Sequence, residues 1–443
     1  MKKICTLLLM LTVLLLTVTA LASCEKATEG LEFYEYGDGY SVGIKDAKYL
    51  DKIVIPKKHN DKPVVTIAKK GFVGCENVVS ISIPDTVTVI EDGAFQNCYK
   101  LETIVIPSNV TTIGQQAFKG CKSLKSIELP SGVVSVGDFA FSNCKALSSI
   151  TISDTVTSLG ANAFEGCTSL VSVSIPKNVT DIGEGIFQKC TSLTTITVDE
   201  SSESFANIEG ALYSKDGTKL YQYPIGLKPT MYQGPDGLTA IGAYAFDGCE
   251  LLTQITIPST VTTVGEKAFN DCPVENATVP TVVIGYLSKD VLKIVDINGG
   301  EKIEKNAFRN SQMLKRLTIS GSDVKTIGDS AFYNCVSLRT VVLAEGLETI
   351  DEYAFKGCVY LTDINLPNTL KTIGISAFKD CNRLTKIIIP FDVEKIGMYA
   401  FEGCLSLKTI YCRGAGRPKG WNEWWKVKDE KGDHTVEWRY DGE

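Results

Sequence analysis

The sequence predicts a repeat solenoid: a stack of short coils with a parallel β-sheet on one face, short helical turns on the other and β-rich caps. Phenylalanine returns every 23 residues over most of the 443-residue chain, and each repeat ends in the apolar alternation of a short strand. A constant period of about 20 to 50 residues indicates stacked supersecondary units. The repeat phenylalanines are Phe72, Phe95, Phe118, Phe141, Phe164, Phe187, Phe246, Phe269, Phe308, Phe332, Phe355, Phe378 and Phe401.

Each repeat reads P-x-x-V-x-x-I-G-x-x-A-F-x-G-C-x-x-L-x-x-I-x-I, most clearly from Pro107 to Leu129. The final isoleucines alternate with a period of two, so Ile127 and Leu129 are predicted to face the core from a short strand. Pro130 ends that strand because proline has no amide hydrogen to donate. Gly114 is expected to break the chain before a single helical turn that places the Ala-Phe pair in the core. One coil cannot bury its apolar face alone, whereas a stack shares one core.

The N-terminus is typical of a secretory signal peptide, residues 1–23. Lys2 and Lys3 precede an apolar run that is short for a membrane-spanning helix. The tetrapeptide LASC, which ends at Cys24, resembles a bacterial lipoprotein box. In that family the cysteine becomes the new N-terminus and carries a diacylglycerol thioether, and two acyl chains give stable anchoring. Residues 24–29 are then a lipidated cysteine and tether, and the protein is expected outside the cytoplasm, touching membrane only through its lipid.

The repeat array is predicted to occupy residues 64–412, between a β-cap at 30–63 and a tryptophan-rich cap at 413–443. All four tryptophans lie in that C-terminal segment; they suit a carbohydrate platform, but the bare core of a last coil also needs an aromatic cover. The period breaks near 200–234, where a hairpin is expected around Asp216-Gly217. It breaks again near 273–303, where a coil keeps its strand spacing but lacks the A-F-x-x-C segment. Both breaks are interpreted as structural, and the hairpin is the better candidate for a binding protrusion.

Most of the 15 cysteines belong to the repeat. A secreted chain with this many cysteines suggests disulfides, but equivalent side chains in stacked coils run parallel about 5 Å apart, which is poor disulfide geometry. Ser311 takes the cysteine position in one repeat, and the spacing lacks the close pairs that zinc sites use. Cys412 falls at an inward strand position. We therefore predict buried free thiols at Cys412 and at Cys75, Cys98, Cys121, Cys144, Cys167, Cys190, Cys249, Cys272, Cys335, Cys358, Cys381 and Cys404.

Charge and motifs argue against nucleic-acid binding and against catalysis. The chain has 45 basic and 52 acidic residues, a net charge of −7, and no basic run, so nucleic acid and anionic membranes are poor candidate partners. The two histidines, His59 and His434, lie near opposite ends of the array, too far apart to share a metal or a triad. Gly414-x-Gly416 lies in a tail loop and not between a strand and a helix, so it is no dinucleotide site. We expect no catalytic residue, cofactor or metal.

The unit ending in A-F-x-G-C, the YS-x-DG hairpin and the C-terminal IYCRGAGRPKGW…VEW stretch together resemble the BspA-like leucine-rich-repeat family. The resemblance runs from about residue 30 to the end of the chain. It implies a leucine-rich-repeat solenoid and a bacterial surface protein, since known members include adhesins for host matrix proteins such as fibronectin and fibrinogen and proteins of cell–cell contact. It implies no catalytic residues, and no motif in the sequence matches a particular ligand.

Parallel stacking would place the residues on either side of each inward isoleucine on one exposed sheet face. In the first two thirds of the array this face is a nearly uncharged series of serine and threonine, which suits a solvated sheet. From Arg316 onward the face also carries charged, amide, aliphatic and aromatic side chains. Binding hot spots favour arginine and aromatic residues, so this part of the face is the better candidate. The candidate binding face is Arg316, Thr318, Thr340, Asp363, Asn365, Lys386, Ile388 and Tyr411.

The sequence thus predicts a lipid-anchored binding protein of the bacterial cell envelope that catalyses nothing. The leading hypothesis is an adhesin that recognises an extracellular or cell-surface protein, such as a matrix protein or a protein of a neighbouring cell. The alternative is a cell-envelope or glycan-binding scaffold with no host target. Protease treatment of intact cells separates the two, because an adhesin must be exposed at the surface.

Overall fold

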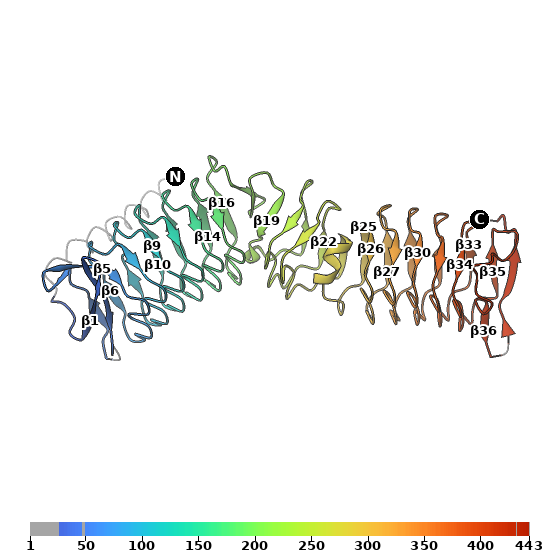
Figure 1. Cartoon of the computed structure of the whole chain (residues 1–443), viewed down its shortest axis with the longest axis horizontal. Coiled ribbons are helices and arrows are strands. Elements are labelled where there is room, and N and C mark those ends of the chain that lie inside the picture. Colours follow the sequence, from blue (N-terminus) through green and yellow to red (C-terminus); the bar gives the residue numbers. More distant parts are fainter. Residues whose placement is uncertain (1–25, 47–48, 431, 443) are drawn as a thin grey trace. The chain divides into compact units, whose positions relative to one another are not determined.

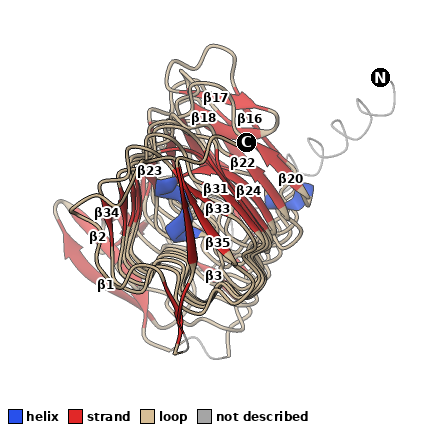
Figure 2. Cartoon of the chain, turned by 90° about the vertical axis from the view of Figure 1, so that its right-hand side faces the viewer, coloured by secondary structure: helices blue, strands red, loops and turns tan. Residues whose placement is uncertain are grey.

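The computed structural model describes residues 26–46, 49–430 and 432–442, and these residues form almost only strands and turns (Figure 1). They make two compact units: one extends to residue 216 and includes 221–227, and the other contains 217–220 and the chain from 228 onward. Helix in the described ranges is limited to two 3₁₀ segments, η1 (Ile225–Leu227) and η2 (Thr281–Tyr286) (Figure 2). None of the helices in these ranges is long and apolar enough to cross a membrane. The predicted signal peptide and Cys24 lie outside the described residues.

Each coil of the first unit contributes two parallel strands. One strand is the predicted Ile-x-Ile segment at the end of the repeat, and these strands are β6 (Ser80–Ser82), β8 (Thr103–Ile104), β10 (Ser126–Leu129), β12 (Ser149–Ile152), β14 (Ser172–Ile175) and β16 (Thr195–Val198). The other has two residues and was not predicted: β7 (Val89–Ile90), β9 (Thr112–Ile113), β11 (Ser135–Val136), β13 (Ser158–Leu159) and β15 (Asp181–Ile182). Equivalent repeat positions pair directly, as Ile127 does with Ile150. The predicted stack of coils is confirmed.

Successive turns, and not a helical turn, carry the Ala-Phe segment of each coil. The amides of Lys119 and Cys121 donate to carbonyls three residues earlier in the same coil. The amides of Phe118 and Gly120 donate instead to the next coil, at 2.7 and 2.8 Å. Gln116 and Gly120 have positive φ angles of 59° and 78°, which interrupt a helix and turn alternate peptide groups toward the neighbouring coil. The hydrogen bonds that would build a helix therefore join the coils.

Gly114 permits close stacking of the coils. A Cβ added there would lie 2.6 Å from both the amide nitrogen of Asp92 and the carbonyl carbon of Glu91. Its φ is outside the left-handed region, so contact with the preceding coil, and not backbone freedom, requires glycine. The position before each repeat cysteine is different, because φ is positive there. This position accordingly carries glycine, asparagine, aspartate or, at Lys189, lysine.

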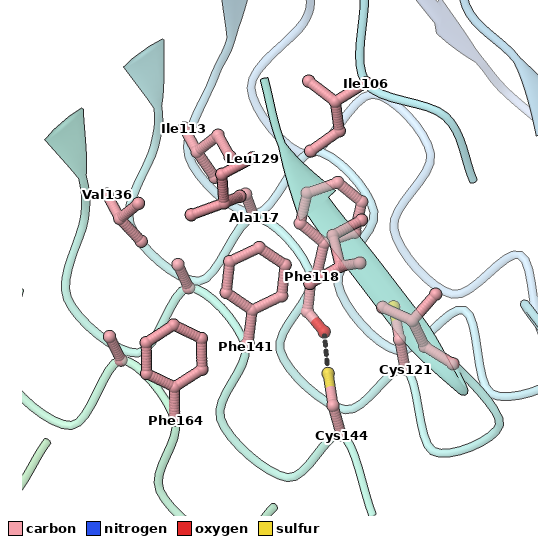
Figure 3. Packing of buried hydrophobic residues seen from close by; sticks show 14 of the residues in the cluster. Ile106, Ile113, Ala117, Phe118, Cys121, Leu129, Val136, Phe141, Cys144 and Phe164 are labelled. Atoms are coloured by element: carbon pink, nitrogen blue, oxygen red, sulfur yellow. Dashed lines mark hydrogen bonds between the residues drawn. The ribbon is translucent and has the colours of Figure 1, made fainter. Parts of the chain in front are cut away.

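Stacked phenylalanines form the centre of the core (Figure 3). The rings of Phe118 and Phe141 are fully buried, with centroids 5.2 Å apart and planes 2° apart, and Phe164 continues the stack at 5.5 Å. Such pairs contribute about 0.5–1.5 kcal/mol beyond the area that they bury. Figure 3 also shows the thiol of Cys144 directed at the carbonyl oxygen of Phe118, 3.2 Å away in the preceding coil. Each repeat therefore joins its neighbour through a ring and a thiol.

An antiparallel hairpin, β1 (Leu31–Tyr36) and β2 (Gly39–Ile44), covers the first coil. Strand β2 pairs in parallel with β5 (Lys62–Ile67), which also holds β4 (Lys58–His59), while β3 (Lys52–Val54) pairs with β6. Phe33 stacks on the imidazole of His59 with ring centroids 3.9 Å apart, and Tyr40 meets the same imidazole edge-on at 4.9 Å. These aromatic contacts shield the apolar end of the stack.

A second hairpin interrupts the array after β16. Strands β17 (Phe205–Ile208) and β18 (Ala211–Ser214) are antiparallel, and their turn residues Glu209 and Gly210 have positive φ angles of 52° and 88°. Two positive φ angles match the twist of a two-residue hairpin. Strand β19 (Lys219–Gln222) follows Asp216-Gly217, so strands lie on both sides of that dipeptide.

The second unit repeats the two-strand coil. Its repeat-end strands are β20 (Met231–Gln233), β22 (Gln254–Thr256), β24 (Asn276–Pro280), β25 (Ile294–Gly299), β27 (Arg316–Ile319), β29 (Thr340–Leu343), β31 (Asp363–Asn365), β33 (Ile387–Ile389) and β35 (Thr409–Cys412). The two-residue strands are β21 (Ala240–Ile241), β23 (Thr263–Val264), β26 (Lys302–Ile303), β28 (Thr326–Ile327), β30 (Thr349–Ile350), β32 (Thr372–Ile373) and β34 (Lys395–Ile396). From β22 to β31, neighbouring repeat-end strands pair in parallel.

In the coil between Phe269 and Phe308, helix η2 takes the place of the A-F-x-x-C turns. Its Ile284 is buried, and the ammonium of Lys289 donates to the carbonyl oxygens of Ile284 and Leu287. That ammonium also lies 5.7 Å from the ring centroid of Phe308. Burial lowers the pKa of Lys289 to about 8. The lysine thus closes the coil in which the phenylalanine and cysteine are missing.

Tryptophans and a buried histidine cover the last coil. Strand β38 (Thr435–Trp438) pairs in parallel with β35, and β36 (Val427–Asp429) pairs with β37 (Gly432–Asp433). Trp425 is buried and meets the ring of Phe401 edge-on at 6.3 Å. Trp421 is also buried, and its Nε1 donates to the carbonyl oxygen of Val393 at 2.9 Å. Trp424 differs, since its side chain is 55% exposed.

The buried imidazole of His434 ends the series of thiol–carbonyl contacts. Its Nε2 lies 3.0 Å from the carbonyl oxygen of Phe401, the group that accepts a cysteine thiol in earlier repeats. Its Nδ1 lies 2.9 Å from the carbonyl oxygen of Leu407. Burial lowers the pKa of His434 although both carbonyls favour the protonated ring. This histidine therefore caps the last coil by contacting two of its backbone carbonyl groups.

Candidate binding face on the parallel strands

Outward side chains of the second unit form two columns across strands β25, β27, β29 and β31. The first column contains Ile294, Arg316, Thr340 and Asp363, and the second contains Asp296, Thr318, Val342 and Asn365. Parallel neighbours are about 4.8 Å apart, so each column is one continuous row of side chains. All five predicted site residues in these columns are exposed or half-buried, and the structure brings them together on adjacent strands.

The other three predicted residues form a separate cluster near the C-terminal cap. Ile388 lies opposite Tyr411 in the register of β33 and β35, and Lys386 immediately precedes β33. The ammonium of Lys386 lies 5.9 Å from the ring centroid of Tyr411 and 5.4 Å from that of Tyr440. The two tyrosine rings are 4.4 Å apart. Tyr440 was missed because it lies in the tail, beyond the last recognisable repeat.

A hollow of about 360 Å³ opens at the start of strands β24, β25, β27 and β29. We call it the basic hollow, and it is lined by Glu275, Asn276, Lys293, Ile294, Lys315, Arg316, Arg339 and Thr340. Four of these eight side chains are cationic and one is acidic. The acid, Glu275, pairs with Lys293 at 2.6 Å. The hollow therefore carries an excess of positive charge on a chain whose net charge is −7.

Two arginines lie over the aromatic ring of Tyr360, beside the basic hollow. The guanidinium carbon of Arg339 lies 5.4 Å from the ring centroid of Tyr360, and that of Arg383 lies 4.4 Å from it. Tyr360 is 38% exposed, so part of its side chain remains accessible to solvent. Guanidinium groups over an aromatic face gain cation–π attraction, which limits their freedom before any partner arrives. The hollow and Tyr360 together place arginine, lysine and tyrosine on one side of the second unit.

The family comparison agrees with these repeats. The BspA type leucine rich repeat region matches residues 45–144, 90–215, 228–293 and 301–414, which span more than half of the chain. The chain belongs to this family. Its matched ranges contain every residue of the candidate face and all of the basic hollow. A search of curated proteins finds no match.

This chain is similar to several solved structures. A leucine-rich repeat protein from Bacteroides ovatus ATCC 8483 is 27% identical, the match covers 94% of this chain and 100% of that chain, and the TM-score is 0.58. The pneumococcal vaccine antigen PcpA is 20% identical over 87% of both chains, with a TM-score of 0.50. A leucine rich cell surface protein from Faecalibacterium prausnitzii A2-165 is 27% identical over 88% of this chain and 94% of that chain, with a TM-score of 0.45.

The repeat cysteines pack inside the BspA-type scaffold. The 13 cysteines of the described ranges are free and buried. Ten thiols contact the phenylalanine carbonyl of the preceding repeat at 3.0–3.3 Å. Burial raises the pKa of Cys190 and of Cys335 to about 12, so these thiols stay protonated at neutral pH. A cysteine nucleophile needs the thiolate, which this environment disfavours.

The two histidines of this BspA-type chain lie in its two caps. His59 stacks on Phe33 in the N-terminal hairpin, and His434 contacts backbone carbonyls in the C-terminal cap. The part of the chain that the structure describes contains no cluster of three or more His, Cys, Asp or Glu side chains able to hold a metal ion. The arrangement that the structure does offer is a broad polar and aromatic sheet face, which suits binding of a macromolecule.

Proposed function

We propose that this chain is a surface binding protein, an adhesin that recognises a protein of the extracellular matrix or of a neighbouring cell. The observation that supports this most is the composition of the strand face of the second unit. Arginine and tyrosine, two of the residue types enriched in protein–protein hot spots, lie there beside lysine and exposed aliphatic side chains. Val342, at 50% exposed, and Ile294, at 40%, add apolar area to that face.

Parallel strands present this face on a rigid support. Each strand is bonded to both neighbours, and the stacked rings beneath hold the coils in register. A rigid surface loses little conformational entropy on binding, which favours affinity. The face is also long enough to contact an extended partner across several coils. A non-enzymatic scaffold is the simplest function that these features support.

We further propose that a lipid on Cys24 holds the chain at the cell envelope. The basis is the LASC tetrapeptide after the apolar segment. The variant Cys24→Ser is expected to appear in the culture medium, whereas the wild-type chain stays with the membrane fraction. Retention of the variant in the membrane fraction would contradict the lipid anchor.

The binding proposal is tested with the soluble chain 24–443 carrying Cys24→Ser. It is applied to an immobilised panel of matrix proteins, mucin, peptidoglycan and glycans at low and at physiological salt. We expect saturable binding to one protein that persists at physiological salt. Binding only to wall polymers or glycans would instead favour an envelope scaffold and would direct attention to the exposed Trp424.

The location of the site is tested with the triple variant Arg316→Ala, Lys386→Ala and Tyr411→Ala. All three side chains point outward, so the fold should persist, as circular dichroism would show. We expect binding to the panel protein to weaken at least tenfold. Undiminished binding by a folded triple variant would exclude this face.

A further inference from the structure

We infer that the basic hollow binds an acidic segment of the partner protein, with glutamate or aspartate side chains at Lys315, Arg316 and Arg339. This inference rests on the proposed function, because it names the chemistry of the partner at the same strand face. It is carried by the alignment of cations in the hollow, the lack of acidic partners for Lys315 and Arg316 among the described residues, and the shape of the surface around them.

Three consecutive coils place a cation at the same repeat position. The amide of Lys315 donates to the carbonyl of Lys293 at 2.8 Å, and the amide of Arg339 donates to the carbonyl of Lys315 at 2.9 Å. Their side chains therefore start about one strand spacing, 4.8 Å, apart. Arg316 adds a fourth cation from the next position of the middle coil. The sequence spacing hides this group, because the three residues are 22 and 24 positions apart.

Most of this charge is not neutralised within the chain. Lys293 has Glu275, and Arg339 lies over Tyr360, but among the described residues no carboxylate is within ion-pairing distance of Lys315 or Arg316. Like charges on adjacent strands repel each other, so the arrangement disfavours folding. An arrangement that opposes folding and yet surrounds a hollow indicates a binding role.

The first unit provides a comparison at the same repeat position. There the corresponding residues are Val79, Glu102, Lys125, Ser148, Val171 and Thr194, joined by the same backbone hydrogen bonds where these are formed. Lys125 is the single cation of that series, and it pairs with Glu102 at 2.6 Å. In the first unit, this repeat position is therefore either uncharged or occupied by an acid and a base that pair with each other. The basic hollow departs from that rule over three coils.

Carboxylates of a protein segment fit this surface better than a uniformly sulfated glycan does. The planar guanidinium of Arg316 or Arg339 can bind an oxyanion through two hydrogen bonds. The same surface offers apolar contacts, since Ile294 lines the hollow and is 40% exposed, and the partly exposed Tyr360 lies against Arg339 of the hollow. A segment that alternates acidic and aliphatic or aromatic side chains would use both kinds of contact. A sulfated polysaccharide would use only the charges.

The test uses the soluble chain 24–443 with Cys24→Ser and a fluorescent decapeptide that contains four glutamates and two leucines. Fluorescence anisotropy compares this peptide with its glutamine analogue and with heparin. We expect the acidic peptide to bind, the glutamine analogue to bind at least tenfold more weakly, and added salt to weaken the complex. Heparin binding without acidic-peptide binding would overturn the inference in favour of a sulfated glycan.

Charge-reversed variants show whether the peptide binds at the basic hollow. Lys315→Glu with Arg316→Glu is expected to weaken peptide binding at least tenfold, whereas Lys125→Gln, at the matched position of the first unit, should leave it unchanged. Neutral Lys315→Gln should raise the midpoint of chemical unfolding, since it relieves repulsion. Equal peptide binding by the double variant and the wild type would overturn the inference.

The panel protein distinguishes this inference from the proposed function. If the double variant binds that protein as tightly as the wild type while the triple variant at Arg316, Lys386 and Tyr411 binds it weakly, the basic hollow is not the contact and the strand face still is. If neither variant weakens binding, the inference fails and the strand face is excluded as the binding site, while the adhesin proposal still rests on binding to the panel protein. If both variants weaken it, both are supported.

Discussion

Alkaline pH should unfold this protein because its repeat thiols are buried. Cys121, Cys144, Cys167 and Cys190 are buried in consecutive coils, and burial raises the pKa of each thiol. The folded-state pKa therefore lies above that of the unfolded chain. The stability that these thiols provide is complete below pH about 8.5, the ordinary thiol pKa, and is lost as the pH rises above it.

The size of the effect follows from the difference in bound protons. At pH 9.5 an unfolded thiol with a pKa of about 8.5 is mostly ionised, which favours unfolding by about 1.4 kcal/mol per thiol. The pKa of about 12 for Cys190 keeps its thiol protonated in the folded chain at that pH. Four such thiols lower the free energy of unfolding by about 6 kcal/mol, which is comparable with the 5–15 kcal/mol total of a typical domain.

The assay is guanidinium unfolding followed by far-ultraviolet circular dichroism at pH 7.5, 8.5 and 9.5, with a reductant present. The matched control carries Cys121→Ser and Cys144→Ser, since Ser311 shows that a repeat tolerates serine at this position. Other titrating groups, including Lys289, are common to both proteins. The control should lose about 3 kcal/mol less than the wild type between pH 7.5 and 9.5. An equal loss in both proteins would refute the thiol argument.

Three further substitutions probe stacking and capping. Gly114→Ala should destabilise the first unit by about 1–3 kcal/mol, because its Cβ would lie 2.6 Å from the amide nitrogen of Asp92; Gly416→Ala, with nothing within 4 Å, should have no effect on the unfolding midpoint. Phe141→Ala should cost about 3–5 kcal/mol in the same assay, since the ring is fully buried between two others, and a smaller loss would show that the stack is loosely packed. Because burial lowers the pKa of His434, stability should be complete above pH about 6.5 and fall as the pH drops below it; His434→Gln should remove this part of the acid sensitivity in unfolding midpoints from pH 7.5 to 5.5.

The repeat fold could be predicted in detail because one pattern recurs in coil after coil. Ile127 and Leu129 alternate in the sequence and are both buried in β10, and the Phe118 ring stacks as a 23-residue period requires. The helical turn was not found, because the bonds within and between coils compete for the same amides. Lys119 bonds within its coil and Gly120 bonds to the next, and the sequence does not show which partner wins.

The candidate site was predictable only in part. Arg316 and Tyr411 occupy outward strand positions, so alternation alone placed them on the face. Lys315 and Arg339 precede their strands, where alternation gives no direction, and their grouping depends on the register of three coils. Tyr440 joins the face from the tail, which has no repeat pattern to align. Residues between regular elements therefore need the structure before they can be assigned.

Lysine labelling with and without bound partner protein tests the central claim most directly, namely that the strand face of the second unit is the binding surface. Lys315 and Lys386 lie on that face, whereas Lys125 and Lys305, each with a side chain 65% exposed, serve as references elsewhere. We predict that saturating partner protects Lys315 and Lys386 from acylation and leaves Lys125 and Lys305 unchanged, as mass spectrometry would show. Protection of Lys125 or Lys305 alone would contradict the account and place the binding surface elsewhere.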